Sequence, residues 1–153
     1  MAEEARPARL VVRRGMPATR EEVFTAWTDP ASIRDWMGPG DTLTAEAELD
    51  LRVGGAYRIV MKSQNRAYEH TGEYQVVELP SKLVFTWFSE GTEHRPTLVT
   101  VELLDHRDGC ELVLTHERFP TADAMKRHRD GWSQIAARLA EYLQKRAPAR
   151  PRG

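Results

Sequence analysis

The sequence predicts an α+β domain in which a curved, seven-stranded antiparallel sheet wraps around one long C-terminal helix. Between residues 42 and 117, short apolar stretches alternate with turn residues, and no helical pattern interrupts them. This is typical of consecutive antiparallel strands. From residue 121 to about residue 146, apolar residues instead recur at steps of three and four, which indicates a helix with one buried face.

The N-terminal part is predicted to form a strand over residues 10–16, followed by two short helices. Thr19 can cap the first helix. Asp29 and Pro30 end it, and Pro30 then suits the first turn of a second helix that closes at the Gly-Pro-Gly segment 38–40. Because this helix pair is not basic and strands follow it, we expect no nucleic-acid partner.

The six remaining strands are predicted at residues 43–51, 55–62, 68–78, 82–89, 97–105 and 110–117. Asp108 and Gly109 predict a tight hairpin between the last two strands. We interpret Gly54 and Gly55 as a tight connection between strands, because a phosphate-binding loop would continue with Lys and Ser or Thr and lead into a helix.

Composition limits the classes of function. A chain of 153 residues, 41% hydrophobic and 29% charged, suits one globular domain, which we expect at 9–146 with flexible tails at 1–8 and 147–153. Lys plus Arg number 22 against 23 Asp plus Glu, so nothing favours an anionic membrane surface or nucleic acid. No stretch is long and apolar enough for membrane insertion. The single cysteine, Cys110, fits a reducing compartment, and we expect a cytoplasmic location.

A set of local motifs resembles one known family. They are the segments 23–27 (Val-Phe-Thr-Ala-Trp), followed by Asp29, Pro30 and Trp36; 50–55 (Asp-Leu-Arg-Val-Gly-Gly); 72–76 (Gly-Glu-Tyr-Gln-Val); 83–87 (Leu-Val-Phe-Thr-Trp); 99–103 (Val-Thr-Val-Glu-Leu); 112–116 (Leu-Val-Leu-Thr-His); and Gly131 with Trp132. In this order, over residues 9–146, they resemble the SRPBCC (START-like) superfamily. Within this superfamily they resemble the branch that is similar to the C-terminal domain of the activator of the ninety-kilodalton heat-shock protein ATPase.

The resemblance implies the helix-grip fold, with the order β-α-α-β6-α, and an internal cavity for a small hydrophobic or aromatic ligand. Members of the superfamily bind hydrophobic molecules, and some are cyclases or dehydratases. An enzyme of that kind, using His116 or His70 with Tyr74, is therefore an alternative, and a module that regulates a chaperone ATPase is another. The eukaryotic co-chaperone carries an additional N-terminal domain, so the fold alone does not transfer its role. A homodimer is left open.

The residues expected to line the cavity are those on inward strand faces, on the buried stripe of the last helix and near the entrance. They are Trp36, Tyr57, Ile59, Met61, His70, Tyr74, Phe85, Trp87, Val99, Val101, Leu114, His116, Met125, His128, Trp132 and Ile135. Within this set, His116 is interpreted first as a hydrogen-bonded core histidine and second as a polar anchor or acid/base. His70, Tyr74 and Trp87 would add polar groups to an aromatic wall.

Neither a metal site nor a cofactor is predicted. The five histidines are far apart in the sequence and Cys110 stands alone, so no close ligand spacing is present. No nucleophile motif of the hydrolase type occurs either.

Overall fold

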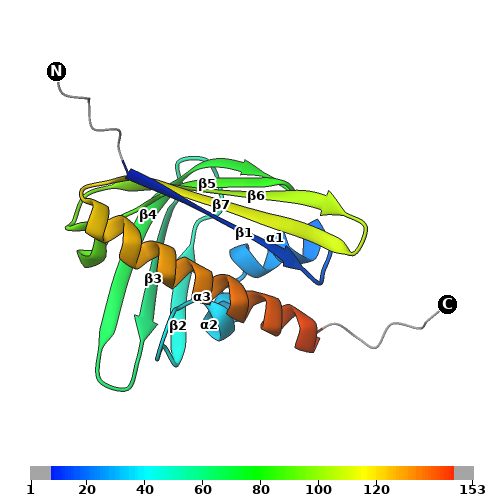
Figure 1. Ribbon diagram of the computed structural model, residues 1–153, viewed down its shortest axis with the longest axis horizontal. Helices are drawn as coiled ribbons and strands as arrows, with labels where there is room; N and C mark the ends of the chain where they lie inside the picture. Colours follow the sequence, from blue (N-terminus) through cyan, green and yellow to red (C-terminus); the bar gives the residue numbers. More distant parts are fainter. Residues whose placement is uncertain (1–7, 147–153) are drawn as a thin grey trace.

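The structure, a computed structural model, describes residues 8–146 (Figure 1). Its elements in chain order are β1 (Ala8–Met16), α1 (Arg20–Thr28), α2 (Pro30–Trp36), β2 (Thr44–Leu49), β3 (Ala56–Lys62), β4 (Ala67–Glu78), β5 (Lys82–Trp87), the short 3-10 helix η1 (Glu90–Thr92), β6 (Thr97–His106), β7 (Gly109–Phe119) and α3 (Ala122–Arg146). The predicted order of strands and α-helices is confirmed. Ala8 already belongs to β1, and the rest of both predicted tails lies outside the described residues.

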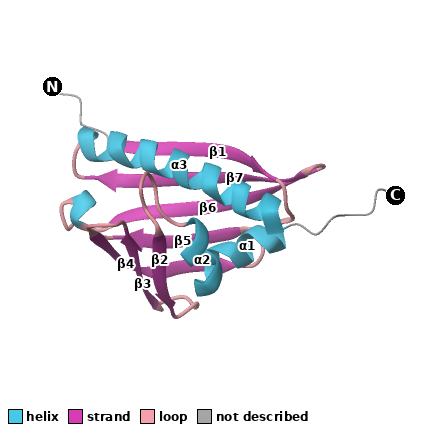
Figure 2. Cartoon of the chain, turned by 90° about the horizontal axis from the view of Figure 1, so that it is seen from below, coloured by secondary structure: helices cyan, strands magenta, loops and turns pink. Residues whose placement is uncertain are grey.

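The seven strands form one antiparallel sheet with the order β1-β7-β6-β5-β4-β3-β2. From β2 to β7 each strand pairs with the next one in the sequence, and β1 pairs with β7. Figure 2 shows that α1, α2 and α3 lie on the same side of this sheet. The predicted α+β helix-grip architecture, a sheet wrapped around a long C-terminal helix, is therefore confirmed.

Local signals explain where the first two helices begin. The Thr19 hydroxyl accepts a hydrogen bond from the Glu22 backbone N–H, and the Glu22 carboxylate accepts one from the Thr19 N–H. This capping box satisfies two N–H groups that the helix leaves unpaired. Asp29 caps α2 by accepting from the Ala31 N–H, and Pro30 follows as its first residue. Both helix starts confirm the sequence prediction.

Two strands, β2 and β5, each end two residues earlier than predicted. β5 stops at Trp87, two residues before the predicted end at Ser89. The Ser89 hydroxyl accepts a hydrogen bond from the Gly91 N–H and so caps η1. The apolar pattern extends to Phe88, which still pairs with Thr71 through an isolated bridge, whereas the cap turns the chain away from the sheet. As a result η1 lies close to the N-terminal half of α3, where His128 approaches Gly91.

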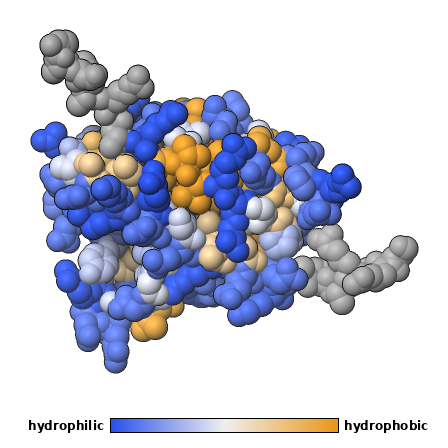
Figure 3. Space-filling model, viewed as in Figure 1, coloured by the Kyte–Doolittle hydropathy of each residue, from blue (hydrophilic) through white to orange (hydrophobic). Residues whose placement is uncertain are grey.

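Helix α3 covers the sheet with its apolar stripe. Trp132, Ile135, Leu139 and Leu143 on this stripe are all buried, and the helix runs beside β1 (Figure 1). The face in Figure 3 is mostly hydrophilic, with an apolar area close to where β1 and α3 run side by side. None of the helices in residues 8–146 has the length and apolar content needed to cross a bilayer.

Candidate functional site

The centre of the molecule, between the sheet and the helices, is filled by aromatic side chains. The ring centroids of Trp27 and Trp36 are 4.9 Å apart, those of Trp27 and Trp132 are 6.1 Å apart, and those of Trp87 and Trp132 are 5.1 Å apart. Such close packing is that of an ordinary protein interior. Trp36, expected near the entrance of a cavity, is only 1% exposed and belongs to this core.

Open space lies at one end of the core, in a groove of about 310 Å³. We call it the aromatic groove. It lies between the N-terminal half of α3 and the strands β3, β4 and β5, with η1 at its edge. Its lining residues are Pro39, Met61, Tyr68, His70, Trp87, Gly91, Arg127, His128, Gly131, Trp132 and Ile135. Its volume is at the lower end of the range for small-molecule sites, about 300–1,000 Å³.

A more polar hollow adjoins the aromatic groove on its outer side, with a volume of about 480 Å³. The two share Tyr68, His70, Gly91, Arg127 and His128. The outer hollow adds polar residues from β4 and the η1 region, among them Glu69, Thr71, Ser89, Glu90 and His94. A ligand in the aromatic groove would therefore have its inner end among aromatic rings and its outer end near polar groups.

His70 is the buried polar residue of the aromatic groove. It is 8% exposed, and its ring centroid lies 4.6 Å from that of Trp87. Its Nδ1 is buried without a hydrogen-bond partner among residues 8–146. Burial lowers the pKa of His70 from 6.5 to about 4, because charging the ring away from water is unfavourable. The ring is neutral at pH 7 and has an unused nitrogen.

His128 forms the edge of the groove on α3. Its Nδ1 donates a hydrogen bond to the Ala124 carbonyl oxygen over 2.8 Å, which leaves Nε2 as the acceptor of a neutral ring. Burial lowers the pKa of His128 as well. Among residues 8–146, these histidines do not assemble with a third His, Cys, Asp or Glu into a group suited to a metal ion.

His116, by contrast, lies in the core and uses both ring nitrogens. Trp132 Nε1 donates to His116 Nδ1 over 2.9 Å, and His116 Nε2 lies 2.7 Å from Thr97 Oγ1. The Thr97 hydroxyl donates to the Trp87 carbonyl, so its oxygen accepts from His116. This chain of hydrogen bonds connects α3, β7, β6 and β5 through a neutral ring, and burial lowers the pKa of His116 well below 6.5. The first interpretation, a satisfied core histidine, matches this geometry.

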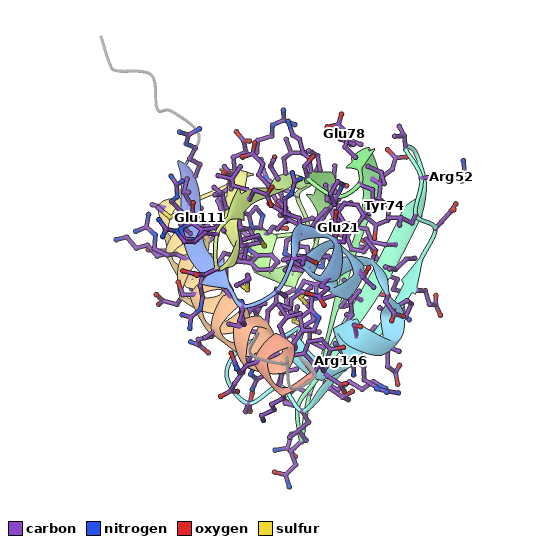
Figure 4. The ribbon with its side chains drawn as sticks, turned by 90° about the vertical axis from the view of Figure 1, so that its right-hand side faces the viewer. Glu21, Arg52, Tyr74, Glu78, Glu111 and Arg146 are labelled. Carbon is purple, nitrogen blue, oxygen red and sulfur yellow. The ribbon has the colours of Figure 1, made fainter. Side chains whose placement is uncertain are left out.

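Six of the residues expected at the cavity line the aromatic groove: Met61, His70, Trp87, His128, Trp132 and Ile135. The others lie outside it. Trp36, Tyr57, Ile59, Tyr74, Phe85, Val99, Val101, Leu114 and His116 are buried in the core, and Met125 packs against the core half-buried. Figure 4 shows Tyr74 within the body of the molecule and Arg52 and Glu78 at its periphery. His70 lines the aromatic groove and Tyr74 does not.

Five lining residues were not among the expected ones: Pro39, Tyr68, Gly91, Arg127 and Gly131. Tyr68 could have been found, because it lies two residues before His70 on the same strand face. Arg127 precedes His128 on α3, and a search for the apolar stripe of a helix passes over a charged residue. Pro39 and Gly91 belong to loops, and no periodic pattern indicates where a loop will lie.

Comparisons with known proteins agree on the fold. A protein from Chromobacterium violaceum has 22% sequence identity and a TM-score of 0.78, covering 89% of this chain and 96% of that one. The AHSA1 protein from Silicibacter pomeroyi has 24% identity and a TM-score of 0.76, covering 92% and 100%. CalU16 from Micromonospora echinospora has 25% identity and a TM-score of 0.69, covering 90% and 76%. A search of curated proteins gave no match.

The family model described as "Activator of Hsp90 ATPase homolog 1-like protein" matches residues 17–144. This span begins just before α1 and ends two residues before the last residue of α3. The match agrees with the superfamily inferred from the sequence motifs, whose fold is of a generally ligand-binding type. The chain therefore belongs to the family of activator of Hsp90 ATPase homolog 1-like proteins.

Proposed function

We propose that this protein binds a small, flat, apolar molecule in the aromatic groove. The observation that carries the proposal is the groove itself, an unfilled space of about 310 Å³ beside a closely packed core, with Trp87 and Trp132 among its lining residues. Flat aromatic walls with a few polar groups are the usual composition of a small-molecule site. The volume favours a ligand of two or three fused rings over a long lipid.

Binding is favoured over catalysis by the state of the candidate acid and base groups. Both nitrogens of His116 are engaged in hydrogen bonds inside the core. Tyr74 packs against Tyr57 and Phe85, away from the groove. His70 does line the groove, but a pKa of about 4 makes it a weak base at neutral pH. We therefore propose a binder and not a cyclase or dehydratase.

The test is the affinity of a neutral aromatic probe, 2-methylnaphthalene, measured by equilibrium titration on wild type and on Gly131→Leu. Gly131 lines the groove from α3, and a Cβ there would meet only Pro39, at 3.7 Å. A leucine side chain should extend into the groove while suiting the helix. We expect saturable binding to wild type and at least a tenfold weaker affinity in Gly131→Leu.

Ser133→Leu is the matched control. It places the same side chain on the same helix, at an exposed position that does not line the groove, and it should bind the probe like wild type. The proposal fails if wild type does not bind the probe saturably. It also fails if the Gly131 and Ser133 variants bind it equally well.

A further inference from the structure

Two polar atoms of residues that line the aromatic groove are buried and have no hydrogen-bond partner among residues 8–146. They are Nδ1 of His70 and Nε1 of Trp87, whose side chains line the groove with rings centred 4.6 Å apart. The residues are 8% and 2% exposed. Buried polar atoms in native proteins are nearly always paired, so an unpaired atom needs an explanation. A third such atom, Nε1 of Trp27, is in the core and outside the groove.

The chemistry of the two atoms limits what can pair with them. An indole N–H only donates, so Trp87 requires an acceptor. The neutral imidazole of His70 accepts at Nδ1 when its proton is on Nε2. A hydroxyl group can form hydrogen bonds with both atoms at once, because its oxygen can accept from Trp87 while its O–H donates to His70. An ether or a ketone could satisfy only the indole, and a hydrocarbon could satisfy neither.

We infer that the ligand of the aromatic groove is a hydroxylated aromatic molecule, with its hydroxyl group held between Trp87 Nε1 and His70 Nδ1. This inference rests on the proposed function and specifies its ligand class. The apolar rings of the ligand lie against Trp132 and Ile135, which line the groove beside the polar pair. Selectivity arises because the hydroxyl group pairs with both buried atoms, whereas an analogue without it leaves them as unpaired as they are in the free protein.

The experiment compares the Kd values of three naphthalenes: 2-naphthol, 2-methylnaphthalene, which has nearly the same shape, and the slightly larger 2-methoxynaphthalene. On wild type we expect 2-naphthol to bind about tenfold more tightly than 2-methylnaphthalene, as for a buried hydrogen bond made or lost. The methoxy compound accepts but cannot donate, so it should bind less tightly than 2-naphthol. This comparison requires no variant and therefore does not depend on how a mutant folds.

His70→Phe assigns the effect to the proposed residue, because it keeps a planar ring next to Trp87 and removes the acceptor. In this variant the preference for 2-naphthol over 2-methoxynaphthalene should disappear, because neither ligand can then donate to position 70. Equal affinity of wild type for 2-naphthol and 2-methylnaphthalene would overturn the inference and leave the proposed function intact. A preference that survives in His70→Phe would overturn the role of His70, and no binding of any of the three ligands would overturn both proposals.

Discussion

His70 and His116 both occupy inward positions on central strands, and both are more than nine-tenths buried. They differ in their hydrogen bonds. His116 accepts from Trp132 and donates to Thr97, whereas Nδ1 of His70 has no partner among residues 8–146. A buried group that loses its partner is costly, but a group that has none can be replaced by an apolar one of similar shape at little cost.

The contrast predicts the stability of two matched variants. His116→Phe should lower the free energy of unfolding by about 2 kcal/mol, because it leaves the Trp132 N–H buried without an acceptor. His70→Phe should change it by less than about 1 kcal/mol, since no hydrogen bond of Nδ1 is broken. Urea unfolding at pH 7 measures both values. Equal destabilisation by the two substitutions would contradict these assignments.

The pH dependence of stability gives a second prediction for His70. Its pKa is about 4 in the folded protein and 6.5 as the ordinary value, so the unfolded chain takes up a proton first as the pH falls. The free energy of unfolding therefore decreases as the pH falls from 6.5 to 4, by up to about 3 kcal/mol.

Urea midpoints between pH 7 and pH 4.5, compared for wild type and His70→Phe, measure this effect. Wild type should lose stability more steeply, since the variant has no imidazole to charge at position 70. His116 and His128 have pKa values lowered in the same direction and contribute alike to both proteins. Parallel profiles for wild type and the variant would show that the low pKa assigned to His70 is wrong.

For a single residue, the sequence could indicate that the side chain is buried but not which groups it forms hydrogen bonds with. The alternation in residues 110–116 places His116 beside Leu112 and Leu114 on the inward face, and that placement is correct. Its partners, Thr97 and Trp132, are 19 and 16 residues away in the sequence. Their contact with His116 depends on strand register and on the rotation of α3, which a local pattern does not specify.

At the scale of elements, α3 has a glycine at a position where the helix has room for a side chain. The nearest atom to a Cβ at Gly131 would be the Pro39 side chain, at 3.7 Å, an ordinary van der Waals contact. Alanine in a helix interior is about 1 kcal/mol more favourable than glycine. We predict that Gly131→Ala raises the free energy of unfolding by about 0.5–1 kcal/mol, measurable as a higher urea midpoint; a lower midpoint would contradict this geometry.

The glycine in β4 is different. A Cβ at Gly72 would overlap the Thr86 carbonyl oxygen of β5 and lie 2.6 Å from the Tyr57 ring. The Tyr57 hydroxyl donates to that same carbonyl over 2.6 Å. Gly72→Ala should therefore disrupt the packing of β3, β4 and β5 and destabilise the protein by about 3 kcal/mol or more. A thermal midpoint within one or two degrees of wild type would refute this interpretation.

The order of the helices and strands could be predicted from the apolar periodicity and the capping residues. The residues at which the elements end could be predicted less accurately. The apolar segment 82–88 predicts a strand, but the cap formed by Ser89 determines where the chain leaves the sheet. Gly72, a glycine inside a strand, leaves room for another group to approach closely. The groups that lie close to Gly72 are the Thr86 backbone of the neighbouring strand β5 and the Tyr57 ring.

At the scale of the whole molecule, the sequence predicted the helix-grip architecture but not how much of its interior would be empty. The apolar stripe of α3 and the inward strand faces determine that helix and sheet pack together. Whether they leave a space depends on the summed volumes and rotamers of side chains such as Trp27, Trp36, Phe85 and Trp132. These fill the centre and leave an open groove at the end bounded by η1.

The indole N–H signals of the four tryptophans report whether this groove takes up an aromatic ligand. In a ¹⁵N-correlated NMR titration with 2-naphthol, the Trp87 and Trp132 signals should shift saturably and with one common Kd, because both side chains line the groove. The Trp27 and Trp36 signals, from rings in the filled core, should move far less. Unchanged Trp87 and Trp132 signals at millimolar 2-naphthol would show that the groove does not bind it.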